Sequence, residues 1–257
     1  DFIFFRKNGL IVNYDTFYKD KTLEVDKISI SDISKDLQIP KESVRRKVEE
    51  LERAGVIKKK GKKIFVDRTG FTTVQAKITL KNISTLLHEF NKILKEENIV
   101  KKAYQTIEIS DSIKINFSFV WYQFYKLLFI FTNRWRKEFG DLETFTIGLI
   151  VLVNAADNKN FRLKEFNKKK YQVSIQGSDN IGVNAMSLAE ITGIPRPTVI
   201  RKLKILIKGN ILQINKKKLI TVNMTGQSLK MARKLQDQNI LSLSNFVSRV
   251  FNQIKVI

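Results

Sequence analysis

The sequence predicts a mainly α protein with small β-hairpins (α+β), built from two similar units that long helices join. Two observations lead to this prediction. Residues 28–67 repeat without a gap 155 positions later, and apolar residues recur at steps of three and four between the two copies. Hydrophobic residues make up 43% of the 257 positions, which is enough to fill a core for each unit.

The repeat is clearest in "IPKESVRRKVEEL" and "IPRPTVIRKLKIL", which begin at Ile39 and Ile194. Apolar positions coincide in the two copies, and about 35 positions keep their chemical character. We refer to residues 28–67 as the first repeat and to residues 183–222 as the second repeat. Such a length of ungapped similarity indicates two copies of one supersecondary unit.

In the first repeat we expect a helix over residues 32–37 with Ser31 as its N-cap, and a turn at residues 38–40. A second helix follows from about residue 41 to residue 54, with Gly55 at its C-terminal cap. Its inward face is predicted to be Val44, Val48 and Leu51. The segments "VIKKK" and "KKIFV" then read as two strands around Gly61.

The second repeat follows the same order, with Gly193 in the turn and strands at "ILQI" and "LITV". The segment "LETFTIGLIVLVNAAD" precedes it and is predicted to be a helix capped by Asp141. At the same offset, a counterpart of this helix would lie before Asp1. We therefore expect the native chain to have an N-terminal helix that this sequence lacks.

Helix, turn, helix and hairpin at this spacing resemble the winged helix-turn-helix domains of bacterial transcription regulators. The segments "SISDISKDLQIPKESVRRKVEELERAGVI" and "SLAEITGIPRPTVIRKLKILIKGNIL" are similar to the MarR-like and IclR-like groups, over roughly a third of the chain. The resemblance implies that the second helix of each repeat enters the major groove of DNA and that the hairpin forms a wing.

The segments outside the repeats are predicted to be long helices. Residues 72–97 and 113–138 carry apolar stripes, and the second stripe is aromatic: Phe117, Trp121, Phe124, Leu128, Phe131 and Trp135. Residues 115–132 approach the length of a membrane span, but Gln123 and Lys126 interrupt them, so we expect a buried or dimerising helix and no membrane. The C-terminal stripe suits packing or a homodimer contact: Leu243, Phe246 or Val247, Val250 and Ile254.

Four segments follow from these patterns. We expect a first winged-helix domain over residues 1–71, a helical connector or dimerisation region over 72–139, a second winged-helix domain over 140–226, and a C-terminal helix over 227–257.

The net charge of +22 points to a polyanionic partner, with nucleic acid ahead of an anionic membrane surface. An AT-rich coding sequence, which inflates Lys, Asn and Ile, is the alternative explanation. The charge is concentrated in the repeats, because residues 27–67 hold 12 basic and 7 acidic residues and residues 182–222 hold 8 and 1.

The candidate DNA-binding residues lie on the second helix of each repeat and on the hairpins. An ordinary solvated helix face explains the helical ones equally well when each copy is taken alone. The arginines suit bidentate contacts with guanine, and the lysines suit phosphates. The full set is Lys41, Ser43, Arg45, Arg46, Lys59, Lys60, Lys62, Arg196, Thr198, Arg201, Lys202, Lys216 and Lys217.

No enzyme signature is present in the sequence. There is no cysteine, the single histidine, His88, lies among apolar residues, and neither a Walker glycine loop nor an H-E-x-x-H motif occurs. We expect neither a catalytic site nor a metal or other cofactor.

These observations predict sequence-specific binding of double-stranded DNA by two non-identical heads, in a cytoplasmic, nucleoid-associated transcription regulator. Two alternatives remain: a plasmid-type replication initiator, which also carries two winged helices, and a tandem winged-helix scaffold for protein interactions. The sequence does not identify an effector ligand.

Overall fold

The structure is a computed structural model that describes residues 11–19, 22–25, 29–60, 63–67, 76–156, 182–223 and 227–255. The chain divides into two compact units. One unit holds residues 1–125 and 245–257, and the other holds residues 126–244. The expected organisation in four segments stays a prediction.

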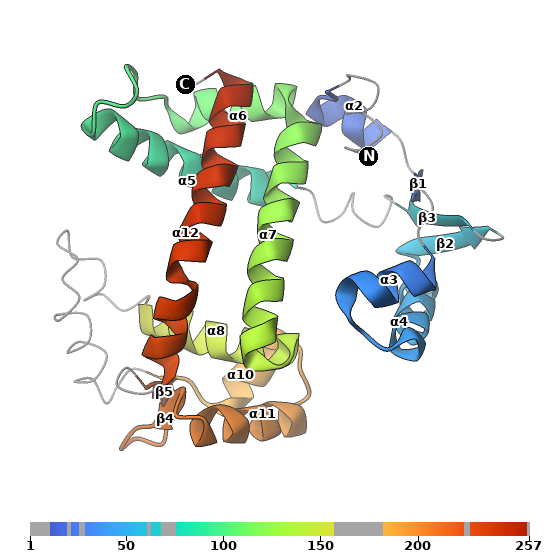
Figure 1. The fold of residues 1–257 in the computed structure, drawn as a ribbon, viewed down its shortest axis with the longest axis vertical. Helices are drawn as coiled ribbons and strands as arrows, with labels where there is room; N and C mark the ends of the chain where they lie inside the picture. The colour runs from blue at the N-terminus through green and yellow to red at the C-terminus, as the bar shows by residue number, and fades with distance from the viewer. Residues whose placement is uncertain are drawn as a thin grey trace. The chain divides into compact units, whose positions relative to one another are not determined.

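The architecture is mainly helical with small antiparallel sheets, as the sequence predicts (Figure 1). The long helices are α5 (Lys77–Glu96), α6 (Thr106–Ile115), α7 (Phe117–Phe139), α8 (Leu142–Ala156) and α12 (Gln227–Ile254). None of the helices among the described residues is long and apolar enough to cross a membrane.

The first repeat folds into α3 (Ile30–Leu37), α4 (Lys41–Arg53), β2 (Ile57–Lys60) and β3 (Lys63–Asp67). Ser29 caps α3, contrary to the expectation of Ser31, because its hydroxyl accepts from the Asp32 amide at 3.2 Å while its own amide donates to the Asp32 carboxylate. The turn between the helices depends on Gln38, whose φ of 54° is left-handed.

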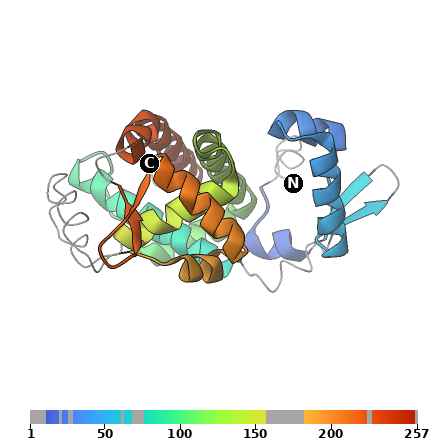
Figure 2. The ribbon, with the colours of Figure 1, turned by 90° about the horizontal axis from the view of Figure 1, so that it is seen from below.

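The sheet of the first repeat has three strands, whereas the sequence predicted two. An additional strand, β1 (Thr22–Val25), pairs antiparallel with β3, and the strand order is β1–β3–β2. Figure 2 shows the β2–β3 hairpin projecting beside α4.

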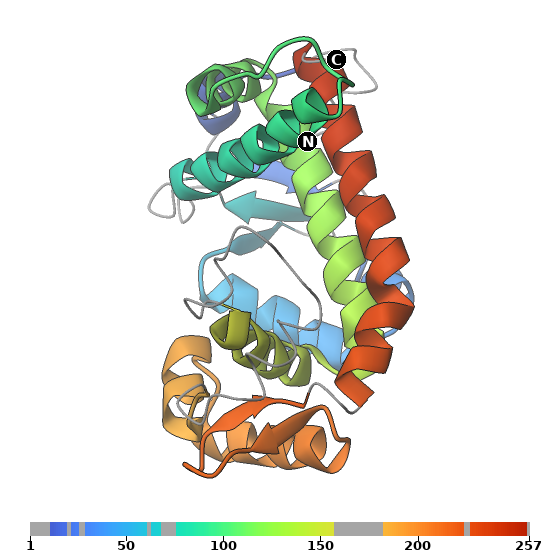
Figure 3. The same ribbon diagram turned by 90° about the vertical axis from the view of Figure 1, so that its left-hand side faces the viewer.

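The second repeat folds into α10 (Ala185–Thr192), α11 (Arg196–Lys208), β4 (Leu212–Ile214) and β5 (Ile220–Val222). Gly193 forms the turn with φ of 66°, as predicted. Strands β4 and β5 pair antiparallel, with Leu212 opposite Val222, and the hairpin is visible in Figure 3. The order of helix, turn, helix and hairpin thus occurs twice among the described residues.

The connector differs from the expected helix over residues 113–138. Instead of a single helix, α6 ends at Ile115 and α7 begins at Phe117. Asn116 lies at the break, where its side chain bonds back to the Ser112 carbonyl at 3.0 Å and accepts from Gln253 of α12 at 3.0 Å. These contacts with its side chain hold the corner between the two helices.

The aromatic stripe of α7 is buried at Phe117 and half-buried at its other aromatic residues. Phe117 is fully buried and stacks on Trp121 with centroids 5.1 Å apart, while Trp135 stacks on Phe145 of α8 at 6.0 Å. Leu128 is the exception, with 39% of its surface exposed. The C-terminal stripe of α12 is buried from Phe246 to Ile254.

In the second compact unit, α12 runs beside α7, and polar contacts reinforce the packing (Figures 1 and 3). Arg134 donates to Asn239 at 2.6 Å and to Ser242 at 3.0 Å. Lys234 pairs with Glu138 at 2.6 Å.

Candidate nucleic-acid interface

Helix α11 presents a cationic face that no acidic side chain of the described residues neutralises. Arg201, Lys204 and Lys208 are exposed, and their steps of three and four place them on one side of the helix. Arg196 is exposed at the N-terminus of α11, and Thr198 is half-buried in the first turn. Within the described part of the chain, none of these four cations forms an ion pair. Lys204 and Lys208 were not among the sequence candidates, although their spacing from Arg201 was the available signal.

Lys202 was also a candidate for contact with DNA, which would require its side chain to face outward, but the structure buries it. It is only 9% exposed, and its ammonium donates to the Asp141 carboxylate at 2.5 Å and lies 3.8 Å from Glu143. Asp141 is also the N-cap of α8, since it accepts from the Thr144 amide at 2.8 Å. Lys202 therefore joins α11 to the start of α8 and is removed from the outward face.

The Asp141 carboxylate is held in its charged form. Partial burial raises its pKa, but hydrogen bonds from Lys202 and from the amide and hydroxyl of Thr144 outweigh that effect, so the pKa lies below its ordinary value. The carboxylate is thus available at neutral pH to fix the Lys202 ammonium.

The hairpin of the second repeat carries three exposed lysines at its tip, Lys216, Lys217 and Lys218. The Asn215 side chain orders this turn by accepting from the amides of Lys217 at 3.0 Å and Leu219 at 2.9 Å. Lys218 adopts a left-handed backbone with φ of 60°. The hairpin therefore ends in a compact turn with exposed lysine side chains, whose ammonium groups suit contacts with phosphates.

Helix α4 of the first repeat differs because carboxylates of the same helix pair with two of its five cations. Arg45 contacts Glu42 and Glu49 at 2.5 and 2.9 Å, and Lys47 contacts Glu50 at 2.6 Å. The hydrogen bond and charge of Glu42 raise the pKa of Arg45, and Glu49 adds to the effect. Among the candidates, Lys41 and Arg46 are exposed and Ser43 is half-buried.

Lysines of the first hairpin also contact neighbouring side chains of the same repeat. Lys58 contacts Asp67 at 2.7 Å, Lys59 lies 3.7 Å from Glu52, and the Lys60 ammonium lies 5.6 Å from the centre of the Phe65 ring. Lys62 lies outside the described residues.

Counting charges on the two 13-residue helices quantifies the difference. Helix α4 has five basic and four acidic residues, whereas α11 has five basic residues and none that is acidic. Even after Lys202 is discounted, α11 remains by far the more attractive surface for a polyanion.

The cores beneath the two helices differ as well. In the second repeat Leu206 is 1% exposed, whereas Leu51, at the same position of the first repeat, is 43% exposed. The prediction that Leu51 faces inward is therefore wrong, although Val44 and Val48 are buried as expected. Helix α8 packs on α11 and contributes Ile147, Val151 and Ala155 to the core there.

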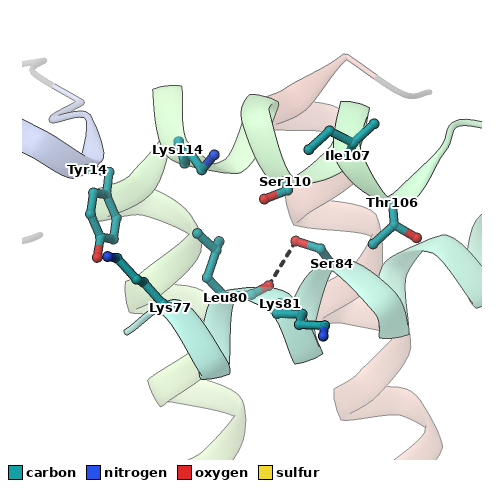
Figure 4. Close-up of a pocket in the computed structure, with 9 residues that line it drawn as sticks. All are labelled: Tyr14, Lys77, Leu80, Lys81, Ser84, Thr106, Ile107, Ser110 and Lys114. Atoms are coloured by element: carbon teal, nitrogen blue, oxygen red, sulfur yellow. Dashed lines mark hydrogen bonds between the residues drawn. The ribbon is translucent and has the colours of Figure 1, made fainter. Parts of the chain in front are cut away.

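A cavity of about 450 Å³ lies between α5, α6 and α2 (Tyr14–Lys19), in the first compact unit (Figure 4). Lys77, Lys81 and Lys114 border it, and the Ser84 hydroxyl in its wall donates to the Leu80 carbonyl at 2.8 Å. His88, on α5, is not among the residues that line this cavity, and its Nδ1 lies 2.7 Å from the Tyr104 carbonyl oxygen. Within the described ranges, no group of His, Cys, Asp or Glu is arranged to hold a metal ion.

Comparison of the chain with protein-family models, with curated proteins and with solved structures gave no significant match, so the candidate interface rests on the geometry described above.

Proposed function

We propose that this protein binds double-stranded DNA through two winged-helix units, with the second repeat as the principal contact surface. In this proposal α11 lies in the major groove and the β4–β5 hairpin follows the phosphate backbone. Binding to a preferred site would serve transcription regulation.

One observation carries the proposal, namely the unneutralised cationic face of α11. Arg201, Lys204 and Lys208 share one side of a 13-residue helix and form no ion pair with any described residue. Three exposed lysines at the neighbouring hairpin tip extend this charge. A helix with this charge suits the groove, and its exposed Ile200 suits contact with a thymine methyl group.

The first repeat takes a lesser part in this proposal. The paired side chains of Arg45 and Lys47 would each have to leave a carboxylate before contacting a phosphate. Lys41 and Arg46 remain as its candidate DNA contacts. The two heads would then read unequal half-sites.

Selection of bound duplexes from a random pool, followed by fluorescence anisotropy on the enriched site, tests this function. Arg201→Ala is expected to weaken binding to that site by about 10- to 100-fold, the effect of one lost base contact. Arg45→Ala serves as the matched control from the first repeat and should change the affinity by less than about threefold. If no duplex binds at low salt, the proposal is wrong.

A further inference from the structure

The structure leaves one helical stripe uncovered in the first repeat that is covered in the second. Position by position, Lys47 and Leu51 of α4 correspond to Lys202 and Leu206 of α11. Each pair is separated by four residues, so each forms a single stripe along its helix.

Helix α8 covers the stripe of the second repeat. A Cβ built on Gly148 of α8 would lie 3.9 Å from Leu206 Cδ1, so the two helices approach closely at this point. At the N-terminus of α8, Asp141 and Glu143 face Lys202, whose side chain is 11% exposed. The covering helix therefore supplies carboxylates to the lysine and a small residue to the leucine.

In the first repeat the same two side chains face solvent. Leu51 is 43% exposed and the Lys47 side chain is 67% exposed. Lys47 contacts Glu50, but the Glu50 side chain is itself 42% exposed, and an ion pair between exposed groups is easily exchanged.

The helix that precedes the first repeat does not cover this stripe. The rings of Tyr14 and Phe17 on α2 pack edge-on against Phe117 of α7, at centroid distances of 5.0 and 5.1 Å. Helix α2 therefore packs on α7 and not on α4. Among the described residues, no helix packs on α4 in the way that α8 packs on α11.

We propose that the Lys47–Leu51 stripe is a docking site for a partner helix with the chemistry of α8. That helix carries a carboxylate in its first turn to meet Lys47. It carries a small residue about two turns later to admit Leu51, and aliphatic residues on the same side.

Two features favour such a helix over other occupants. The charge is complementary, because an acidic N-terminal turn faces a lysine, and the second repeat already holds this pairing in the same chain. The mixed stripe, with one cation and one large aliphatic residue a turn apart, also matches the face of a single helix.

A peptide of residues 141–156 with two added C-terminal lysines and a fluorophore tests the proposal against the full chain. Anisotropy should show saturable binding of one peptide per chain. Leu51→Glu should weaken it at least tenfold, and Lys47→Glu about fivefold. A peptide with Asp141→Lys and Glu143→Lys should bind more tightly to the Lys47→Glu chain than to the unmodified chain.

Ile205→Glu is the matched control, because Ile205 is 54% exposed on α11 and lies outside the proposed docking site. Its peptide affinity should equal that of the unmodified chain. The proposal is overturned if no saturable binding occurs, if Leu51→Glu binds equally well, or if charge reversal has no reciprocal effect. It is also overturned if light scattering without peptide shows a dimer that Leu51→Glu dissociates, since a second copy would then occupy the face. The assay contains no DNA, so its outcome is independent of the function proposed above.

Discussion

Salt dependence offers the sharpest test of the proposal that α11, and not α4, makes the main contact with DNA. We consider the replacement of Arg201, Lys204 and Lys208 by Gln in one variant. All three side chains are exposed and have no ion-pair partner among the described residues. On a random-sequence duplex, which offers Arg201 no selected guanine, each of the three is available to a phosphate. Glutamine keeps a similar length and helix propensity and removes only the charge.

The size of the effect follows from counterion release. Each phosphate that a cation neutralises contributes about −0.9 to the slope of log affinity against log salt. Three lost contacts should make the slope shallower by about 2.7. Between about 50 and 200 mM salt, the unmodified protein should therefore lose about 40-fold more affinity than the variant does.

Fluorescence anisotropy of a random-sequence duplex, titrated over that salt range, measures the slope. The matched control is Arg45→Gln with Lys47→Gln on α4, where both cations already contact carboxylates. Its slope should change by less than about 1. An unchanged slope in the α11 variant, or a larger change in the α4 variant, would refute the assignment of the main contact to the second repeat.

Three further predictions concern stability and are checked by chemical denaturation. Leu206→Ala should lower the free energy of unfolding by about 2–5 kcal/mol because it opens a cavity under α8. Leu51→Ala, at an exposed site, should lower it by less than about 1 kcal/mol. Equal losses in the two variants would contradict the observed burial. Lys202→Met should lower the free energy of unfolding by about 1–2 kcal/mol, because the Lys202–Asp141 ion pair is half-exposed. Lys47→Met should change it by no more than about 0.5 kcal/mol. A Lys202→Met variant of unchanged stability would argue against the stabilising role of the Lys202–Asp141 pair. Gln38→Gly should raise the free energy of unfolding by about 0.5–1 kcal/mol, because glycine adopts the left-handed backbone of this position without strain. A loss of stability would show that contacts of the Gln38 side chain contribute more than the backbone strain costs.

The helices and hairpins of both repeats could be predicted from the sequence because they depend on local signals. Apolar residues at steps of three and four mark α4 and α11, and glycine marks the turn at Gly193. The cap of α8 at Asp141 was likewise readable from a residue that commonly starts helices.

Features that depend on distant partners were missed. Strand β1 exists because β3 offers it an edge, and its own four residues, "TLEV", carry too little pattern to predict a strand. The break at Asn116 depends on a side-chain contact with Gln253, which is 137 positions away. Neither contact leaves a local signal.

Lys47 and Lys202 separate the two kinds of information most clearly. The sequence by itself determined that both are lysines at the same position of a repeated amphipathic helix, and that each helix is followed by a hairpin. Tertiary structure alone decided that Lys202 is buried against Asp141 while Lys47 stays exposed. Helical periodicity is encoded in neighbouring residues, whereas burial depends on which other segment packs on the helix, and α8 covers only the second copy.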